Sequence, residues 1–280
     1  MSLPASGALV TFGWNAVMVS SDHPLIAEAL QTHFRHCGVL QADVIANLHI
    51  TATSDTHFMG SVDGSDFFSN LGYEQALWLV MNEVITRLNA NCTGGLVFHA
   101  AALASAKDAI ILCGGSGCGK SSLAAWLTAD GFHYLTDEVI QAPLEEDHIT
   151  GLTRSIVLKR SSAFIWQTRL PDQPSPGFLS FQDGSVWIDP QLFHPNAAKS
   201  TATPRLLIFP CYEAGAPLQT RKLTGAEALF RLLQTLVNAR NLPGHGMDAA
   251  TRLARQVTAY SLTYSNLEDA SAWIHKTFQE

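Results

Sequence analysis

Apolar residues follow two kinds of pattern along this chain of 280 residues. In some segments they recur every three or four positions, which is the spacing of one face of an α-helix, and in others they form short runs typical of buried strands. The helical pattern covers residues 24–30, 73–85 and 226–237, with a further helix expected from about residue 266. Strands are predicted at residues 8–12, 48–52, 95–103, 109–113, 132–136, 155–160, 205–210 and 259–264.

Two of the predicted strands are close enough in sequence to fix how they pair. Only residues 104–108 separate the run at 95–103 from the run at 109–113. A connection between parallel strands needs a dozen or more residues, whereas antiparallel strands can be joined by a short turn. We therefore expect an antiparallel hairpin at this position.

Local signals mark where several elements begin and end. Thr224 followed by Glu227 has the spacing of a capping box, which predicts that a helix begins there. Asp130-Gly131 is typical of a helix end. Residues 167–184 are rich in proline and predict a mobile surface segment.

The second strand of the hairpin leads into the pattern G-x-x-x-x-G-K-[ST], which is the signature of a phosphate-binding loop. Its glycines allow successive backbone N–H groups to turn toward phosphates, Lys120 can reach the β- and γ-phosphate oxygens, and the Ser121 hydroxyl can ligate Mg²⁺. The helix predicted from residue 121 would direct the positive end of its dipole at the same anion. The nucleotide-binding residues predicted in this way are Gly114, Gly115, Ser116, Gly117, Cys118, Gly119, Lys120, Ser121 and Ser122.

An acidic pair, Asp137-Glu138, ends the strand that follows the loop helix. In proteins with a phosphate-binding loop, a carboxylate at such a strand end holds Mg²⁺ or orients the nucleophile. The pair is thus a candidate for metal binding or for catalysis. Arg205, at the start of a predicted strand, is a candidate for a contact with phosphate, but we favour a surface position for it.

Charge and cysteine content narrow the class of partner. The formal net charge is −7 and no dense cluster of lysine and arginine occurs, which argues against nucleic acid or an anionic membrane as partner. No apolar run is long enough to span a bilayer, and the N-terminus lacks the pattern of a secretory signal. The five cysteines form no C-x-x-C pair, which favours a reducing compartment. We expect a cytoplasmic protein whose partners are small molecules or proteins.

The chain resembles the HPr serine kinase family in four segments. They are Phe98-His99-Ala100-Ala101 on the hairpin, the loop at 114–122, the segment 127–132 and Asp137-Glu138. That family includes HPr-kinase-related proteins encoded with modified-peptide clusters, among them the lasso-peptide precursor kinases. The resemblance covers roughly residues 95–165. It implies an α/β fold with a P-loop kinase core of the HPr kinase and phosphoenolpyruvate carboxykinase type, a mixed sheet with flanking helices. This catalytic domain would span residues 93–280, after a small N-terminal α/β region, residues 1–92, of unknown role.

The resemblance also implies roles for individual residues. The loop would bind ATP with Mg²⁺, Asp137 would accept the proton of the substrate hydroxyl, and Lys120 and His99 would act next to the phosphates. The related kinases carry an apolar strand with a lysine where residues 155–160 lie, which makes Lys159 a candidate for a contact with phosphate or, equally, a surface residue. Ser121 and Glu138 would ligate the metal, although the family usually carries two aspartates at the acidic pair. The Arg-Gly-Leu-Gly segment that is linked with phosphorylase activity in true HPr kinases is absent, so phosphorolysis is not expected.

The function implied is that of an ATP-dependent serine kinase acting on a peptide or small protein, such as a ribosomal precursor peptide. Two alternatives stay open: an enzyme acting on a small molecule, and a nucleotide-binding sensor without transfer chemistry. The resemblance also allows a homo-oligomer. Nothing in the sequence identifies the acceptor, and residues 1–92 show no evident chemistry.

Overall fold

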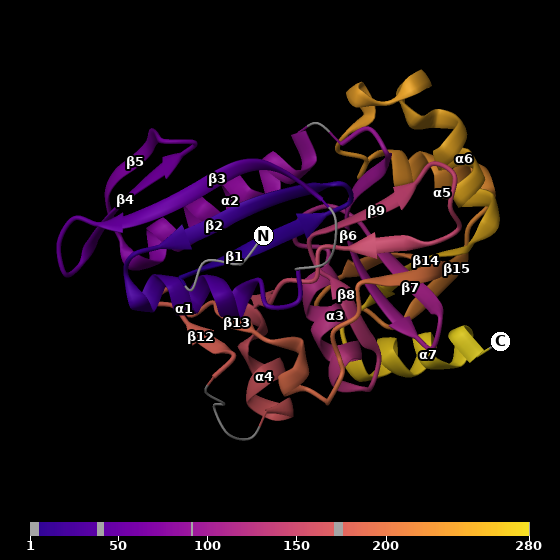
Figure 1. The fold of residues 1–280 in the computed structure, drawn as a ribbon. Helices are drawn as coiled ribbons and strands as arrows, with labels where there is room; N and C mark the ends of the chain where they lie inside the picture. The colour runs from indigo at the N-terminus through magenta and orange to yellow at the C-terminus, as the bar shows by residue number, and fades with distance from the viewer. Residues whose placement is uncertain (1–5, 38–41, 91, 171–175, 280) are drawn as a thin grey trace.

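The computed structural model describes residues 6–37, 42–90, 92–170 and 176–279. It shows a mixed α/β protein in which the described residues up to 90 form one side of the molecule, residues 178–188 pack against them, and most of the later residues form the other side (Figure 1). Within the described residues, no helix has both the length and the apolar character needed to cross a membrane.

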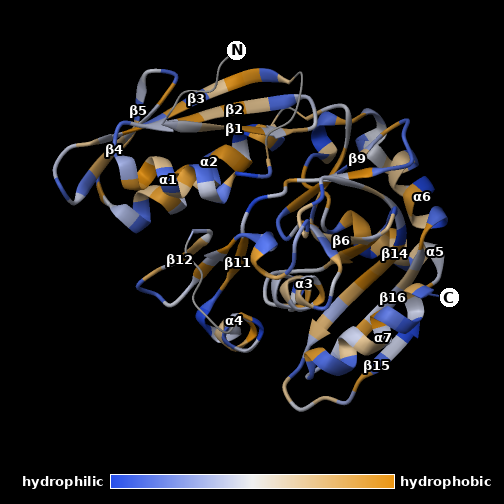
Figure 2. Cartoon of the chain, turned by 60° about the horizontal axis from the view of Figure 1, so that its bottom comes forward, coloured by the Kyte–Doolittle hydropathy of each residue, from blue (hydrophilic) through white to orange (hydrophobic). Residues whose placement is uncertain are grey.

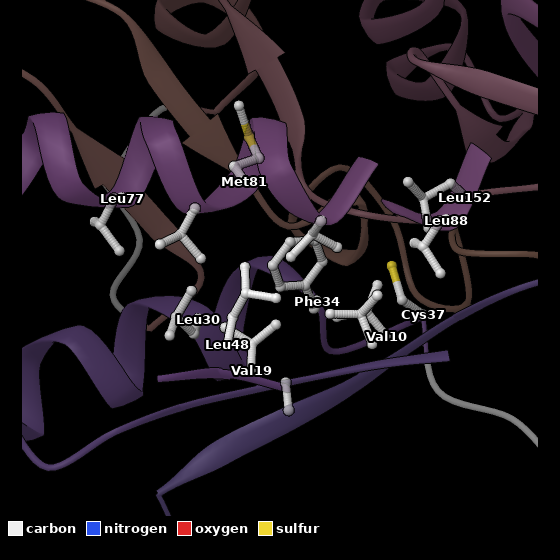
Figure 3. Close-up of a cluster of buried hydrophobic side chains, with 14 of the residues drawn as sticks. Val10, Val19, Leu30, Phe34, Cys37, Leu48, Leu77, Met81, Leu88 and Leu152 are labelled. Carbon is white, nitrogen blue, oxygen red and sulfur yellow. The ribbon is translucent and has the colours of Figure 1, made fainter. Parts of the chain in front are cut away.

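The N-terminal sheet has the strand order β1-β2-β3-β4-β5. Its pairs are antiparallel except β2 and β3, which run parallel because helix α1 connects them. Helix α2 packs on the same sheet, with Leu77 and Leu88 directed toward it and Met81 on the opposite side of the helix (Figure 3). The bounds are β1 Gly7–Phe12, β2 Asn15–Ser21, α1 Pro24–His33, β3 Asp43–Ala52, β4 His57–Val62, β5 Ser65–Gly72 and α2 Tyr73–Ala90.

The main sheet has the order β10-β9-β6-β7-β14-β16-β15, and β8 also pairs with β6. Strands β6 and β7 are antiparallel, which confirms the predicted hairpin, whereas β7, β14 and β16 are parallel to one another. The bounds are β6 Gly95–Ser105, β7 Asp108–Cys113, β8 His133–Thr136, β9 Val139–Pro143, β10 Ile149–Gly151, β14 Thr201–Tyr212, β15 Gln219–Lys222 and β16 Thr258–Tyr264.

Helices cover both faces of the main sheet. Successive residues of a strand point to opposite faces, so alternate residues of β7 meet different helices. On β7, Ile110 and Leu112 pack with α3 and α7, whereas Ile111 and Cys113 pack with α5 and α6. The helix bounds are α3 Lys120–Ala129, α5 Gly225–Leu233, α6 Met247–Gln256 and α7 Leu267–Gln279.

A small sheet of order β11-β13-β12 lies between the N-terminal region and helix α3 (Figure 2). Its residue Trp187 belongs to the N-terminal core cluster, whereas Ile156 and Leu158 belong to the cluster around α3. The bounds are β11 Ile156–Leu158, α4 Ala163–Arg169, β12 Phe178–Ser180 and β13 Val186–Ile188.

Polar contacts also join the first region to the rest of the chain. The buried carboxylate of Asp189 pairs with Arg35 at 2.8 Å and with His36 at 2.9 Å. The backbone N–H of Ser155 donates to the carbonyl of His33, at the end of α1, at 2.8 Å. Helix α1 is thus fixed to the residues that precede β11.

Several predicted boundaries differ from the structure. The helix predicted over 226–237 ends at Leu233, and the strand predicted over 155–160 is limited to Ile156–Leu158. The segment 167–184 is partly regular, since α4 extends to Arg169 and β12 follows, while Pro171 and Pro174 lie outside the described residues. The capping box is confirmed, with Thr224 and Glu227 bonding each other's backbone.

Candidate nucleotide-binding cleft

The phosphate-binding loop connects β7 to α3, as the sequence predicts. Gly117 and Gly119 adopt φ values of 84° and 96°, in the left-handed region that side chains with a Cβ rarely enter. Gly119 is the N-cap of α3, and no side chain caps this helix. The first N–H groups of α3 therefore have no side-chain partner, and a helix terminus of this kind suits an anion.

Lys120 folds back over the loop that precedes it. The residue is buried, and its Nζ donates to the carbonyls of Gly114 at 2.7 Å and Gly115 at 3.1 Å. Because a buried ammonium needs hydrogen-bond acceptors, these carbonyls hold the lysine within the loop. Phosphate oxygens placed at the loop would offer it anionic acceptors instead.

Asp137 is buried at the end of β8 and has partners on both carboxylate oxygens. Tyr134 Oη donates to Oδ1 at 2.7 Å, and the backbone N–H of Val157 donates to Oδ2 at 3.5 Å. Burial raises the pKa of Tyr134 well above its ordinary value, and the Asp137 charge raises it further, so the phenol remains a donor. This arrangement fixes the orientation of the carboxylate.

Arg154 connects the two acidic residues. Its Nη2 lies 3.3 Å from Asp137 Oδ1 and 2.7 Å from Glu138 Oε2, and the side chain is almost fully buried. Burial acts to lower the pKa of Arg154, but the charges of Asp137 and Glu138 outweigh it and raise the value above its ordinary range. The guanidinium therefore stays charged and balances the pair.

Glu138 is the more accessible carboxylate, with 26% of its side chain exposed against 1% for Asp137. His99 on β6 lies beside it, with 3.6 Å between His99 Nδ1 and Glu138 Oε1. The Glu138 carboxylate thus stands between a buried arginine and a partly exposed histidine, and it faces the cleft.

A cleft of about 1320 Å³ brings most of the predicted residues together. It is lined by Ser116, Gly117, Gly119, Lys120, Ser121, Ser122, Asp137, Glu138, His99 and Lys159. Gly114, Gly115 and Cys118 line a second cavity of about 690 Å³, to which His99 also contributes. Different residues of the loop thus line two cavities, and the carboxylates belong to the larger of these two.

Arg205 lies apart from both cavities. It pairs with Asp108 at 3.5 Å and its guanidinium lies 5.3 Å from the ring centre of Phe278. Neither cavity is lined by Arg205, so the suggested contact with phosphate does not fit this arrangement.

The sequence did not indicate three groups of residues in the cleft. One is Arg154, which precedes a short strand and is recognised only through its long-range contacts. Another is the pair Trp126 and Arg169, whose guanidinium lies 3.9 Å from the indole centre. The third is a set on helix α2, in the region where no chemistry was evident, and it comprises Trp78, Met81 and Asn82.

The donor set fits a metal ion that is held mainly by a nucleotide. Among the described residues, no cluster of three or more His, Cys, Asp or Glu side chains could hold a metal by itself. Mg²⁺ is commonly bound through one or two protein oxygens together with phosphates and water. Ser121 and Glu138, which both line the cleft, are a set of that size.

Fold and cleft together define a mixed α/β protein in which a phosphate-binding loop faces a pair of carboxylates. No family model matches the chain, and no curated protein matches it. Among solved structures, the HPr(Ser) kinase/phosphatase from Coxiella burnetii is similar over 65% of this chain and 90% of its own, with 15% identity and a TM-score of 0.34. At this level of similarity, membership of the kinase family remains an expectation.

Proposed function

We propose that the protein is an ATP-dependent kinase that transfers the γ-phosphoryl group to a seryl hydroxyl of a peptide or small protein. The supporting observation is that the second half of the phosphate-binding loop, Lys120 and both members of the acidic pair line one cleft. Catalysis of phosphoryl transfer depends chiefly on alignment and charge neutralisation, and this cleft holds the groups for both.

In this proposal the loop and α3 bind the triphosphate of ATP. Lys120 exchanges the carbonyls of Gly114 and Gly115 for β- and γ-phosphate oxygens, and the N-terminus of α3 faces the same anion. Ser121 and Glu138 would hold Mg²⁺, which supplies positive charge to the phosphate oxygens when it is bound. Glu138 would keep its ion pair with Arg154 while it acts as a metal ligand.

Asp137 is proposed to accept the proton of the acceptor hydroxyl. The seryl Oγ forms a bond to the γ-phosphorus as the bond from that phosphorus to the bridging oxygen breaks, and ADP leaves. Tyr134, Arg154 and the Val157 N–H orient Asp137, so its carboxylate is fixed before the acceptor arrives. His99 lies beside Glu138 and would contact the phosphates from β6.

The two alternative functions, a small-molecule kinase and a nucleotide sensor, would use the residues of the cleft in different ways. A small-molecule kinase would use the same loop and base with a different acceptor. A nucleotide sensor would need the loop and a metal ligand, and it would have no use for an oriented base.

The test is ATP binding by calorimetry, followed by transfer from γ-labelled ATP with Mg²⁺ to serine-containing peptides. Lys120→Ala is expected to weaken ATP binding and transfer together. Asp137→Asn is expected to bind ATP within about twofold of the wild type and to lower transfer about 10²- to 10⁴-fold, the range for loss of a general base.

Each result has a distinct meaning. Wild-type ATP affinity in Lys120→Ala would contradict the role of the loop. Loss of ATP binding in Asp137→Asn, but not in Glu138→Gln, would assign the metal to Asp137 instead. ATP binding without transfer to any acceptor would favour the sensor.

A further inference from the structure

Helix α2 of the N-terminal region contributes a wall to the cleft. Trp78, Met81 and Asn82 are spaced by three and four positions and so share one helix face. The Trp78 ring is fixed by edge-to-face packing on Trp187, at 5.5 Å between ring centres, and by Phe181 at 5.9 Å. This α2 wall is therefore rigid at its aromatic end and ends in an exposed amide, Asn82.

The α2 wall lies on the side of the acidic pair. Asp137 accepts a hydrogen bond from the backbone N–H of Val157. Val157 in turn packs against the N-terminal core cluster that contains Trp187 and Met81. On the other flank of the loop, Tyr264 Oη donates to the carbonyl of Gly119 at 3.3 Å. Figure 2 shows the same order, with α2 and β11 on one side of α3 and β16 and α7 on the other.

This arrangement matters because in-line transfer brings the acceptor from the side of the γ-phosphate that faces away from the leaving nucleotide. A nucleotide held at the loop leaves the space between the acidic pair and α2 for the acceptor. The volume of the cleft, about 1320 Å³, exceeds the roughly 300–1,000 Å³ of ordinary small-molecule pockets and allows for a second ligand.

The chemistry of the α2 wall indicates what kind of acceptor it suits. The half-buried Trp78 indole, with the buried Met81 beside it, offers an apolar surface, while the exposed Asn82 amide can both donate and accept hydrogen bonds. Asp183 and Ser185, on the turn before β13, also line the cleft. Asp183 is exposed, and the backbone N–H of Ser185 donates to its carboxylate at 2.7 Å. Apolar and amide groups side by side match a polypeptide, in which apolar side chains alternate with backbone amides.

We propose that the α2 wall is the acceptor-binding surface of the kinase and that the acceptor is a peptide with an aromatic or aliphatic residue next to the phosphorylated serine. This inference rests on the proposed kinase function. It assigns the N-terminal region a part in substrate selection.

The experiment uses the full chain and positional-scanning peptide mixtures that contain one fixed serine, with γ-labelled ATP and Mg²⁺. The variants are Trp78→Ala and Asn82→Arg, the second because Asn82 is exposed and can be replaced without opening the core. Trp14→Ala is the matched control, since Trp14 belongs to the same region, is 68% exposed and lines neither cavity.

The wild type and Trp14→Ala are expected to prefer apolar residues beside the serine. Trp78→Ala should lose that preference and raise the peptide KM about tenfold or more, with ATP affinity unchanged within about twofold, and Asn82→Arg should raise the KM at unchanged thermal stability. These shifts follow from removing a large apolar contact and from placing a cation in the cleft.

Equal peptide preference in Trp78→Ala and Trp14→Ala would overturn the inference while leaving the kinase proposal intact. Transfer to small hydroxyl compounds but to no peptide would overturn the inference and would also replace the proposed peptide kinase by a small-molecule kinase. Absence of ATP binding or of any transfer would instead contradict the proposed function itself.

Discussion

At the scale of single residues, Arg154 decides the arrangement of the acidic pair. It contacts Asp137 and Glu138 through one nitrogen, Nη2, and its Nη1 donates to the carbonyl of Ser155 at 3.0 Å. Both Arg154 and Asp137 are almost fully buried. A buried charge without its partner is far more costly than a broken ion pair at the surface.

Arg154→Met is therefore expected to lower the free energy of unfolding by about 3–5 kcal/mol, because it leaves Asp137 buried without a counter-charge. Urea denaturation measures this loss. Arg205→Met is the control, since its pair with Asp108 is 3.5 Å long and half-exposed and should contribute less than about 1 kcal/mol. Equal losses in the two variants would show that Arg154 does not neutralise the pair.

The candidate site was predictable from sequence where its residues are close neighbours in the chain. The loop and Lys120 form a contiguous motif, and Asp137 follows one helix and one strand later, so local spacing sufficed. Arg154, Trp78 and Met81 reach the cleft through contacts between distant segments, which no local pattern encodes. Arg205, for which a surface position was the favoured interpretation, lines neither cavity.

At the scale of elements, the turn from β7 into α3 depends on two glycines that differ in their surroundings. Both have positive φ, but a Cβ on Gly119 would collide with the Tyr264 hydroxyl, whereas a Cβ on Gly117 would meet nothing within 4 Å. The two positions separate backbone strain from steric overlap.

Gly117→Ala is expected to cost about 1–2 kcal/mol through strain at a left-handed position, and Gly119→Ala should cost clearly more, since it adds the overlap with Tyr264. Thermal unfolding compares the two variants. Combining Gly119→Ala with Tyr264→Phe should restore part of the difference, and a lack of any recovery would argue against the overlap.

The start of α5 offers a prediction that depends on pH. Backbone hydrogen bonding with Thr224 and the side chain of Arg221 lower the pKa of Glu227 from 4.5 to about 2. Since the folded pKa is lower than the unfolded value, the carboxylate stabilises the fold above about pH 4.5, and this contribution is lost as the pH falls toward 2.

Glu227→Gln should therefore be less stable than the wild type at pH 7, and the difference should shrink between pH 4.5 and pH 2. Denaturation curves at a series of pH values measure it. A difference for Glu227→Gln that is independent of pH would rule out the capping carboxylate as its source.

The fold was predictable where an element is long or bounded by a strong signal. The hairpin followed from the short turn at 104–108, and the start of α5 followed from its capping box. Helix α4 was missed because its seven residues are too few for an apolar period to show. The helix predicted to residue 237 ends at Leu233, because the following residues bond instead to β6, through Thr235 to His99 and through Val237 to Val97.

At the scale of the whole molecule, Asp189 holds the N-terminal region against the rest. Its buried carboxylate is shared by Arg35 and His36, which follow α1. Asp189→Asn is expected to lower stability by about 1–3 kcal/mol and to speed hydrogen exchange in both α1 and β13, since hydrogen bonds to a charged group are lost.

Asp108→Asn is the control for that experiment, because its longer contact with Arg205 joins two neighbouring strands of the main sheet. It should leave exchange in α1 unchanged. Faster exchange confined to β13 in Asp189→Asn would show that this carboxylate does not fix the N-terminal region.

The core cluster around α2 contains residues from both sides of residue 92, among them Val97, Leu152 and Trp187 together with Leu77 and Met81. Folding of the first region and the shape of the cleft are therefore thermodynamically linked. Any molecule that binds the folded cleft raises the melting temperature of the whole chain, by an amount equivalent to about 2.7 kcal/mol at a hundred times its Kd. Candidate acceptors can thus be screened by the rise in melting temperature that they cause. A non-hydrolysable nucleotide would be present in such a screen, so no turnover is required.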